Sequence, residues 1–133
     1  MPAVSSQDQF LAGSTYAVVG ASKDRSKFGN IVLRCYLQHG YKAIPLHPAV
    51  PEIEGLATYP QLAALPEPVH GVSIVTPPSV TETVIDDAIR LGIRHLWIQP
   101  GAEHPAAIER AEAAGLNVIH GGPCLMVVLG FPD

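Results

Sequence analysis

The chain has few of the residues that mark several large classes of protein. Charged residues make up 15% of its 133 positions, and 8 basic against 12 acidic residues give a formal net charge of −4. A nucleic-acid-binding surface needs many distributed cations, so this balance argues against a nucleic-acid partner. No apolar run approaches the roughly 18 residues that span a bilayer, and no signal sequence is recognisable in the first ten residues. We therefore expect a cytoplasmic protein that does not bind membranes.

Motifs of common catalytic sites are also missing. The 6 histidines show no H-x-x-x-H or H-E-x-x-H spacing, so no metal site is expected. The sequence contains neither the G-x-S-x-G motif of a nucleophile elbow nor the G-x-x-x-x-G-K-[ST] motif of a P-loop. Cys35 and Cys124 lie far apart without a C-x-x-C motif, which fits free thiols in a reducing compartment. Nothing here predicts a catalytic site, although enzymatic activity is left open.

What the chain does have is enough apolar sequence for one domain. Hydrophobic residues make up 47% of the chain, and we predict a single domain over residues 1–133 in which residues 1–13 form a lead-in. Short β-branched runs alternate with helical patterns that end at a glycine. The predicted strands are 16–19, 42–46, 71–75, 95–98 and 117–119, and the predicted helices are 28–39, 80–91 and 105–114, with a short helical turn at 60–65.

Five strands separated by helices predict an α/β fold with a parallel sheet. Short connections and right-handed crossovers favour a Rossmann-type, doubly wound arrangement, for which we predict the strand order 3-2-1-4-5. In such sheets the ligand lies across the carboxyl ends of the strands. The residues that follow each predicted strand are therefore the candidates for a binding site.

The segment after the first predicted strand is the most informative of these. An apolar run ends at Gly20-Ala21-Ser22, and a helix is predicted from residue 28. A small-residue turn at the start of a helix brings backbone N–H groups and the positive helix end to one place, where a phosphate binds well. The alternative is that Gly20 only turns the chain. Basic residues gathered in this loop favour the phosphate site: Lys23, Arg25 and Lys27.

Two features bear on the class of nucleotide. A dinucleotide site of the nicotinamide or flavin type typically has G-x-G-x-x-G and, about 20 residues later, an acidic residue for the ribose. Here the turn has Gly20 and then Gly29, and the second predicted strand is followed by His47 and Pro48. An acidic residue would repel a ribose phosphate, whereas His47 tolerates one. The sequence therefore favours a phosphorylated ribose.

The chain resembles a known family, the small stand-alone CoA-binding domain proteins, which are similar to the N-terminal domain of the succinyl-CoA synthetase α subunit. The matching motifs run in order through nearly the whole chain: Val19-Gly20-Ala21-Ser22 with Lys27-Phe28-Gly29, Gly40-Tyr41-x-x-Ile44-Pro45-x-x-Pro48, Tyr59-Pro60-x-Leu62 with Leu65-Pro66, Thr76-Pro77-Pro78, Trp97-Ile98-Gln99-x-Gly101, Ala114-Gly115-Leu116 and Pro123-Cys124.

The resemblance implies that coenzyme A is the ligand. It places the phosphates on the turn of Gly20, Ala21 and Ser22, with Lys27-Phe28-Gly29 behind it and the basic side chains as counter-charges. The adenosine then lies toward His47 and Pro48. It further implies that the middle of the ligand packs along Thr76, Pro77 and Pro78, and that Gln99 and Gly101 line the route of the pantetheine arm.

The family's synthetases carry their phosphorylated histidine in a second domain, which is not expected in this chain. We therefore predict a module that binds CoA or an acyl-CoA without ligase activity. The relatives in this family often carry an arginine and an aromatic residue after the third strand, where this chain has Thr76-Pro77-Pro78, and this difference keeps a ligand-free interaction scaffold open. Another nucleotide, such as NAD in an enzyme or redox protein, is a further alternative. Cys124 is either a packed residue or a thiol that faces the ligand. A homo-oligomer or an unknown protein partner also stays open.

Overall fold

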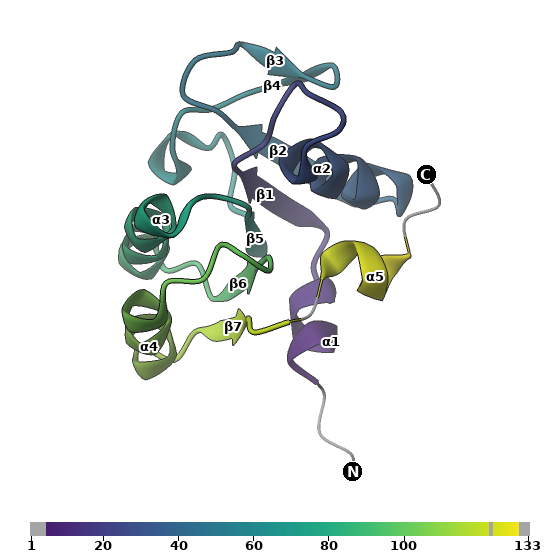
Figure 1. The fold of residues 1–133 in the computed structure, drawn as a ribbon. Helices are drawn as coiled ribbons and strands as arrows, with labels where there is room; N and C mark the ends of the chain where they lie inside the picture. The colour runs from purple at the N-terminus through teal and green to yellow at the C-terminus, as the bar shows by residue number, and fades with distance from the viewer. Residues whose placement is uncertain (1–4, 123, 131–133) are drawn as a thin grey trace.

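The structure is a computed structural model that describes residues 5–122 and 124–130 (Figure 1). Its elements alternate between strand and helix along most of the chain. In order they are α1 (Ser6–Leu11), β1 (Thr15–Val19), α2 (Phe28–Gln38), β2 (Lys42–Leu46), β3 (Glu52–Ile53), β4 (Leu56–Ala57), the 3-10 helix η1 (Leu62–Ala64), β5 (Gly71–Ile74), α3 (Pro78–Leu91), β6 (His95–Ile98), α4 (Pro105–Ala113), β7 (Asn117–Ile119) and α5 (Leu125–Leu129).

The main sheet has five parallel strands, which confirms the predicted α/β class and Rossmann-like architecture. The strand order is β2-β1-β5-β6-β7. The predicted order 3-2-1-4-5 is therefore wrong, because the third strand, β5, pairs with β1 and not with β2.

Pro45 explains this order. It lies inside β2 and has no N–H group to donate to a neighbouring strand, so proline is tolerated in edge strands and not in central ones. The predicted order would have put β2 in a central position. On the open side of β2 the carbonyl of Pro45 accepts a hydrogen bond from Tyr59 (3.2 Å), and His47 donates one to the Tyr59 carbonyl (3.0 Å). The irregular segment around Tyr59 thus covers the sheet edge.

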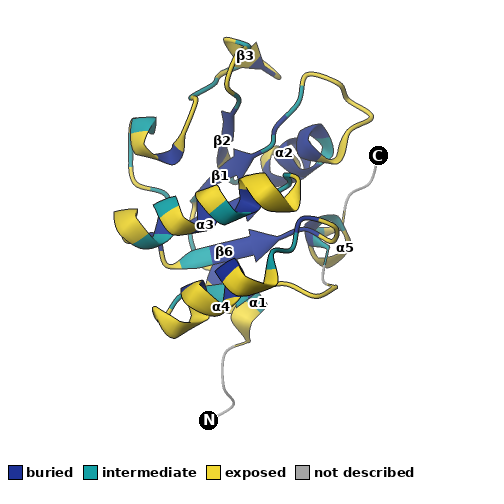
Figure 2. Cartoon of the chain, turned by 60° about the vertical axis from the view of Figure 1, so that its left-hand side comes forward, coloured by how far each residue is buried: buried dark blue, intermediate teal, exposed yellow. Residues whose placement is uncertain are grey.

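Helices cover both faces of the sheet (Figure 1). Helices α3 and α4 lie on one face, where Ala17 and Val19 of β1 point; helices α1, α2 and α5 lie on the other, with Tyr16 and Val18. Side chains that alternate between the faces produce this division. Figure 2 shows the strands as buried beneath helices whose outer sides are exposed.

The N-terminal segment predicted as a lead-in contains helix α1, which packs on the sheet. Its anchor is Phe10, which is fully buried. The Phe10 ring stacks on Tyr16 with 5.1 Å between ring centroids and meets the edge of Trp97 at 5.3 Å. The Tyr16 hydroxyl donates a 2.6 Å hydrogen bond to the Phe10 carbonyl. Among residues 5–122 and 124–130, none of the helices has the length and apolar character that crossing a bilayer requires.

Candidate functional site

Two glycines bring helix α2 against the end of β1. Gly20 has φ 93°, a conformation that favours glycine, and a Cβ at this position would lie 2.1 Å from the Val75 carbonyl oxygen. A Cβ at Gly29, in the first turn of α2, would lie 1.9 Å from the Gly20 carbonyl oxygen. No side chain fits at either contact. The two glycines therefore place the N-terminus of α2 directly over the ends of β1 and β5.

The loop between these glycines presents free backbone N–H groups. Those of Ala21, Ser22, Phe28 and Gly29 donate no hydrogen bond to any other residue that the structure describes. Lys27 is the N-cap residue of α2, and its side chain does not cap the helix. The first turn of a helix carries a partial positive charge in addition to its unsatisfied N–H groups. The loop is thus prepared to bind an anion.

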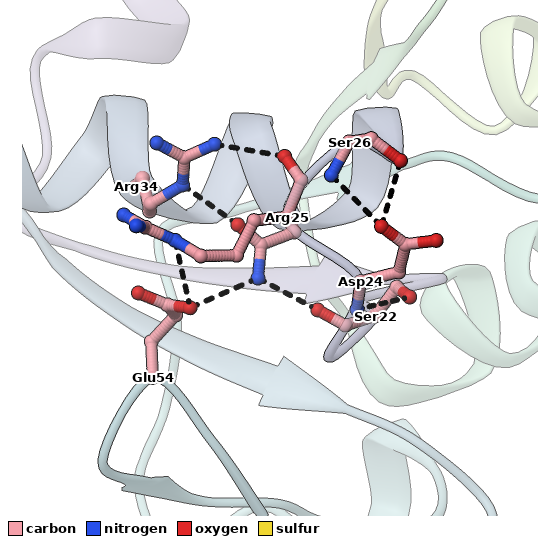
Figure 3. A network of polar contacts seen from close by, with 7 residues as sticks. Ser22, Asp24, Arg25, Ser26, Arg34 and Glu54 are labelled. Carbon is pink, nitrogen blue, oxygen red and sulfur yellow. Dashed lines mark hydrogen bonds and ion pairs between the residues drawn. The ribbon is translucent and has the colours of Figure 1, made fainter. Parts of the chain in front are cut away.

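Two buried polar residues of α2 hold the loop in this shape (Figure 3). Asn30 is fully buried and donates through Nδ2 to the Ser22 carbonyl (2.8 Å), and the Arg34 guanidinium donates to the Arg25 carbonyl (2.9 Å). Arg34 Nε also donates to Asn30 Oδ1 (2.7 Å). Both loop carbonyl groups therefore point toward α2, where their partial negative charge does not repel an anion bound to the loop.

Neither Asn30 nor Arg34 was predicted from the sequence as a site residue. A signal existed, because polar residues four positions apart lie on one side of a helix and can interact with each other. Their role here is to position the loop backbone.

The charges of the loop are less uniformly positive than its basic residues suggest. Lys23, Arg25 and Lys27 are all exposed, but the Arg25 guanidinium pairs with Glu54 (Nε to Oε2, 3.5 Å). Asp24 lies among them, and its pKa is lowered mainly by hydrogen bonds from the Ser26 hydroxyl and backbone N–H, with a smaller contribution from Lys27. The Ser22 hydroxyl accepts from the Asp24 backbone N–H (3.0 Å) and keeps its own proton to donate.

A cavity of about 440 Å³ opens beside the first half of the loop, between the ends of β1 and β2 and helix α3. It contains several predicted site residues. Its lining is Val19, Gly20, Ala21, Leu46, His47, Pro48, Pro60, Gln61, Leu62, Thr76, Val80, Thr83, Val84 and Asp87. Apolar side chains with a few polar groups are typical of small-molecule sites.

Hydrogen bonds fix the polar groups of this cavity. His47 Nδ1 accepts from the backbone N–H groups of Ala49 (3.0 Å) and Val50 (3.1 Å), so the ring proton of the neutral histidine is on Nε2. The Thr76 hydroxyl bonds that of the buried Thr81 (2.7 Å).

Pro77 and Pro78 form the start of α3 as its N-cap and first residue. Proline suits this place because its φ is already helical and its missing N–H needs no partner. Neither lines the large cavity. Their position gives them a structural role in beginning the helix.

A smaller cavity, of about 80 Å³, lies beside the other end of the loop and is lined by Phe28, Val75, Gln99, Pro100 and Cys124. Phe28 is 63% exposed. Gln99 is buried, and its amide accepts from the Leu125 N–H (3.0 Å) and donates to Cys124 Sγ (3.4 Å). The Gln99 amide thus holds the start of α5. Gly101 lines neither cavity, and its N–H donates to Glu103 (2.8 Å).

The two thiols differ in their surroundings. Cys35 is fully buried in α2, and burial raises its pKa to about 11, with a smaller effect from Cys124. Cys124 is partly exposed. Pro123, which precedes it and belongs to the predicted motif, lies outside the described residues. Within the described part of the chain, no group of three or more His, Cys, Asp or Glu residues is placed to hold a metal ion.

Comparison with known families decides the assignment. Residues 14–130 match the family described as CoA binding domain. The chain belongs to this family. Among solved structures, a conserved hypothetical protein from Pyrococcus furiosus is 39% identical to this CoA binding domain with a TM-score of 0.81, and the match covers 86% of this chain and 98% of that one.

Two further solved structures are similar to this chain and differ in how much of their own length the match covers. A hypothetical protein from Pyrococcus horikoshii is 28% identical, with a TM-score of 0.85 and coverage of 93% of this chain and 89% of that one. The dinucleotide-forming acetyl-coenzyme A synthetase 1 of Ca. Korarchaeum cryptofilum is 34% identical, with a TM-score of 0.69. That match covers 79% of this chain but 25% of the synthetase chain. This CoA binding domain is therefore similar to one part of a larger enzyme.

The predicted site residues of the CoA binding domain fall into distinct places. Gly20, Ala21, His47, Pro48 and Thr76 meet at the large cavity, and Phe28, Gln99 and Cys124 meet at the small one. Five others lie in the loop between the two cavities, namely Ser22, Lys23, Arg25, Lys27 and Gly29. Pro77, Pro78 and Gly101 line neither cavity.

Proposed function

We propose that this chain binds coenzyme A or an acyl-CoA across the carboxyl ends of its strands, and that it does so as a binding module. The observation that carries the proposal is the order of three features. The large cavity begins at Gly20 and Ala21, the loop with free N–H groups follows, and the small cavity adjoins Phe28. CoA has the same order, with an adenosine, a diphosphate and a pantetheine arm.

The loop suits the charged middle of such a ligand. Free N–H groups at the start of α2 hydrogen-bond phosphate oxygens at little cost, because Asn30 and Arg34 already hold the loop backbone. Lys23 and Lys27 are exposed beside these groups. They supply charge that the CoA 3′-phosphate needs, and CoA binding is expected to weaken as salt is raised.

The large cavity suits the adenosine. Its volume of about 440 Å³ lies within the range of about 300–1,000 Å³ common for small-molecule sites. Leu46, Val80 and Val84 give it an apolar wall, and the Nε2–H group of His47 is left to donate to a ribose or phosphate oxygen. β2 ends in Leu46-His47-Pro48 without the acidic residue that an NAD ribose requires, which favours CoA over NAD.

The pantetheine arm is assigned to the side of Phe28 and Cys124. The small cavity is too narrow to enclose it, so the arm lies over the exposed Phe28 ring with its thiol toward Cys124. Both cysteines of the chain are free thiols. This supports the further proposal of a reducing, cytoplasmic location.

Isothermal titration of the reduced protein with CoA, acetyl-CoA, NAD and ATP at one salt concentration tests the proposal. We expect CoA and acetyl-CoA to bind with similar affinity and NAD and ATP to bind far more weakly. Tighter binding of NAD, or no binding of any of the four, would overturn the assignment.

A pair of variants locates the ligand. Val80→Trp fills the large cavity from an exposed position on α3, and Leu91→Trp adds the same bulk at an exposed position of that helix outside the cavity. We expect Val80→Trp to lower the affinity for CoA at least tenfold and Leu91→Trp to leave that affinity unchanged.

A further inference from the structure

The hairpin of β3 and β4 places a carboxylate on the phosphate loop. Glu54 lies in its turn and pairs with Arg25, and its Oε2 accepts a 3.1 Å hydrogen bond from Asn30 Nδ2. Figure 3 shows the Glu54 side chain pointing from the hairpin toward Arg25. A residue of a separate element thus neutralises one of the loop's basic side chains.

We propose that Glu54 competes with the ligand's phosphate for Arg25, and so lowers the affinity of the loop for anions. This inference rests on the proposed function, since it concerns the same loop. A carboxylate and a phosphate oxygen use the same N–H donors of a guanidinium. A phosphate that binds Arg25 through Nε therefore has to displace Glu54.

The competition acts on every anion that uses Arg25. The same ion pair between Glu54 and Arg25 breaks whichever anion binds, so the free-energy cost of displacing Glu54 does not depend on the ligand. Glu54 thus lowers the affinity for every anion at Arg25 by a similar factor.

The backbone at Glu54 has the conformation of a tight hairpin turn. Glu54 has φ 50° and the following Gly55 has φ 77°, as in the two-residue hairpin turns that favour Asn or Asp followed by Gly. Glutamate is not the residue that this turn prefers. Its longer side chain, however, spans the distance to Arg25.

Variants at two positions of the hairpin separate this role from a general effect of charge. Glu54→Gln removes the charge and keeps an oxygen that accepts from Asn30. Glu54→Asn removes the charge, shortens the side chain so that it no longer reaches Arg25, and provides a residue that the turn favours. Glu52→Gln removes the same charge from an exposed position of β3. Arg25→Ala and the double variant Arg25→Ala/Glu54→Gln complete the set.

The experiment is isothermal titration of the wild type and each variant with CoA and, separately, with inorganic pyrophosphate. We expect Glu54→Gln and Glu54→Asn to bind both about twofold to fivefold more tightly, the range of an exposed ion pair. Glu52→Gln is expected to match the wild type. In the Arg25→Ala background the change at Glu54 is expected to have no effect, because the contested side chain is absent.

The outcomes distinguish this inference from the proposed function. If the wild type binds CoA and the Glu54 variants bind it equally or more weakly, the competition is overturned and CoA binding stands. If CoA does not bind but pyrophosphate binds more tightly to Glu54→Gln through Arg25, the competition stands and the CoA assignment falls. If neither ligand binds any variant, both are overturned.

Discussion

Gly29 packs against the carbonyl group of Gly20, and the contact leaves no room for a side chain: a Cβ at position 29 would lie 1.9 Å from that oxygen. The contact joins the start of α2 to the end of β1. It therefore sets the place of the free N–H groups relative to the large cavity.

Gly29→Ala is expected to lower both stability and ligand affinity. The added methyl group forces the helix away from the strand, and overpacking of this kind costs about 1–3 kcal/mol of unfolding free energy. Urea denaturation and titration with CoA measure the two effects. Gly40→Ala is the control, because Gly40 has φ 80° with nothing within 4 Å of a Cβ. It is expected to lower the free energy of unfolding through backbone strain alone and to leave CoA affinity unchanged. CoA binding to Gly29→Ala at the wild-type affinity would contradict the assignment of this loop.

The basic side chains of the loop are expected to distinguish two phosphorylated forms of the ligand. Replacing both Lys23 and Arg25 by alanine is expected to weaken CoA about tenfold or more, and dephospho-CoA less, if they contact the 3′-phosphate. A matched control is the double variant Lys42→Ala/Arg94→Ala, which removes the same charge near the opposite ends of the strands. Equal losses for CoA and dephospho-CoA would instead assign both cations to the diphosphate.

The two cysteines are expected to differ sharply toward a thiol reagent. Burial raises the pKa of Cys35 to about 11, so at pH 8 about one molecule in a thousand carries its thiolate, and its side chain is inaccessible in the fold. With a disulfide reagent such as DTNB, one thiol per native chain is expected to react quickly, and Cys124→Ser is expected to abolish that reaction.

Bound CoA is expected to slow the reaction of Cys124, since the pantetheine arm is assigned to its side of the loop. The reagent rate is measured with and without CoA, with unfolded protein as the reference for two reactive thiols. An unchanged rate in the presence of saturating CoA would show that the pantetheine arm does not lie beside Cys124.

Stability is expected to fall in alkali because of Tyr16. Burial raises its pKa to about 12 against 10.0 for a free tyrosine. Between these values the unfolded chain loses the proton and the folded chain keeps it, so the free energy of unfolding decreases as pH rises, by up to about 1.4 kcal/mol per pH unit from this group. Chemical denaturation from pH 9 to 12 measures the slope, and absorbance at 295 nm follows ionisation. Tyr16→Phe is expected to be less stable but to show a shallower slope; an unchanged slope would assign the effect to other groups.

Much of the fold could be predicted because the strands and long helices are encoded locally. β2, β6 and β7 match their predicted bounds, and α2 begins at the predicted residue. The strand order could not be read from that pattern, since periodicity does not say which strands are neighbours. Pro45 carried the missing information, because a proline within a strand indicates an edge.

Short elements and side-chain networks were missed for another reason. Helices α1 and α5 and the β3–β4 hairpin are too short for a periodic pattern, and tertiary packing decides whether they form. Glu54-Gly55 fits a hairpin turn only once the strands around it are known. Likewise, the glycines and cations of the loop predicted a phosphate-binding site from the sequence. The hydrogen bonds through which Asn30 shapes the loop could not be predicted, since they depend on where the helix lies.

The most direct test of CoA binding at the strand ends is a titration of ¹⁵N-labelled protein with CoA, followed by amide chemical shifts. The account predicts that the largest shifts fall on the free N–H groups of Ala21, Ser22, Phe28 and Gly29, together with His47 and its neighbours at the large cavity. Shifts confined to other surfaces, or none at saturating CoA, would contradict it.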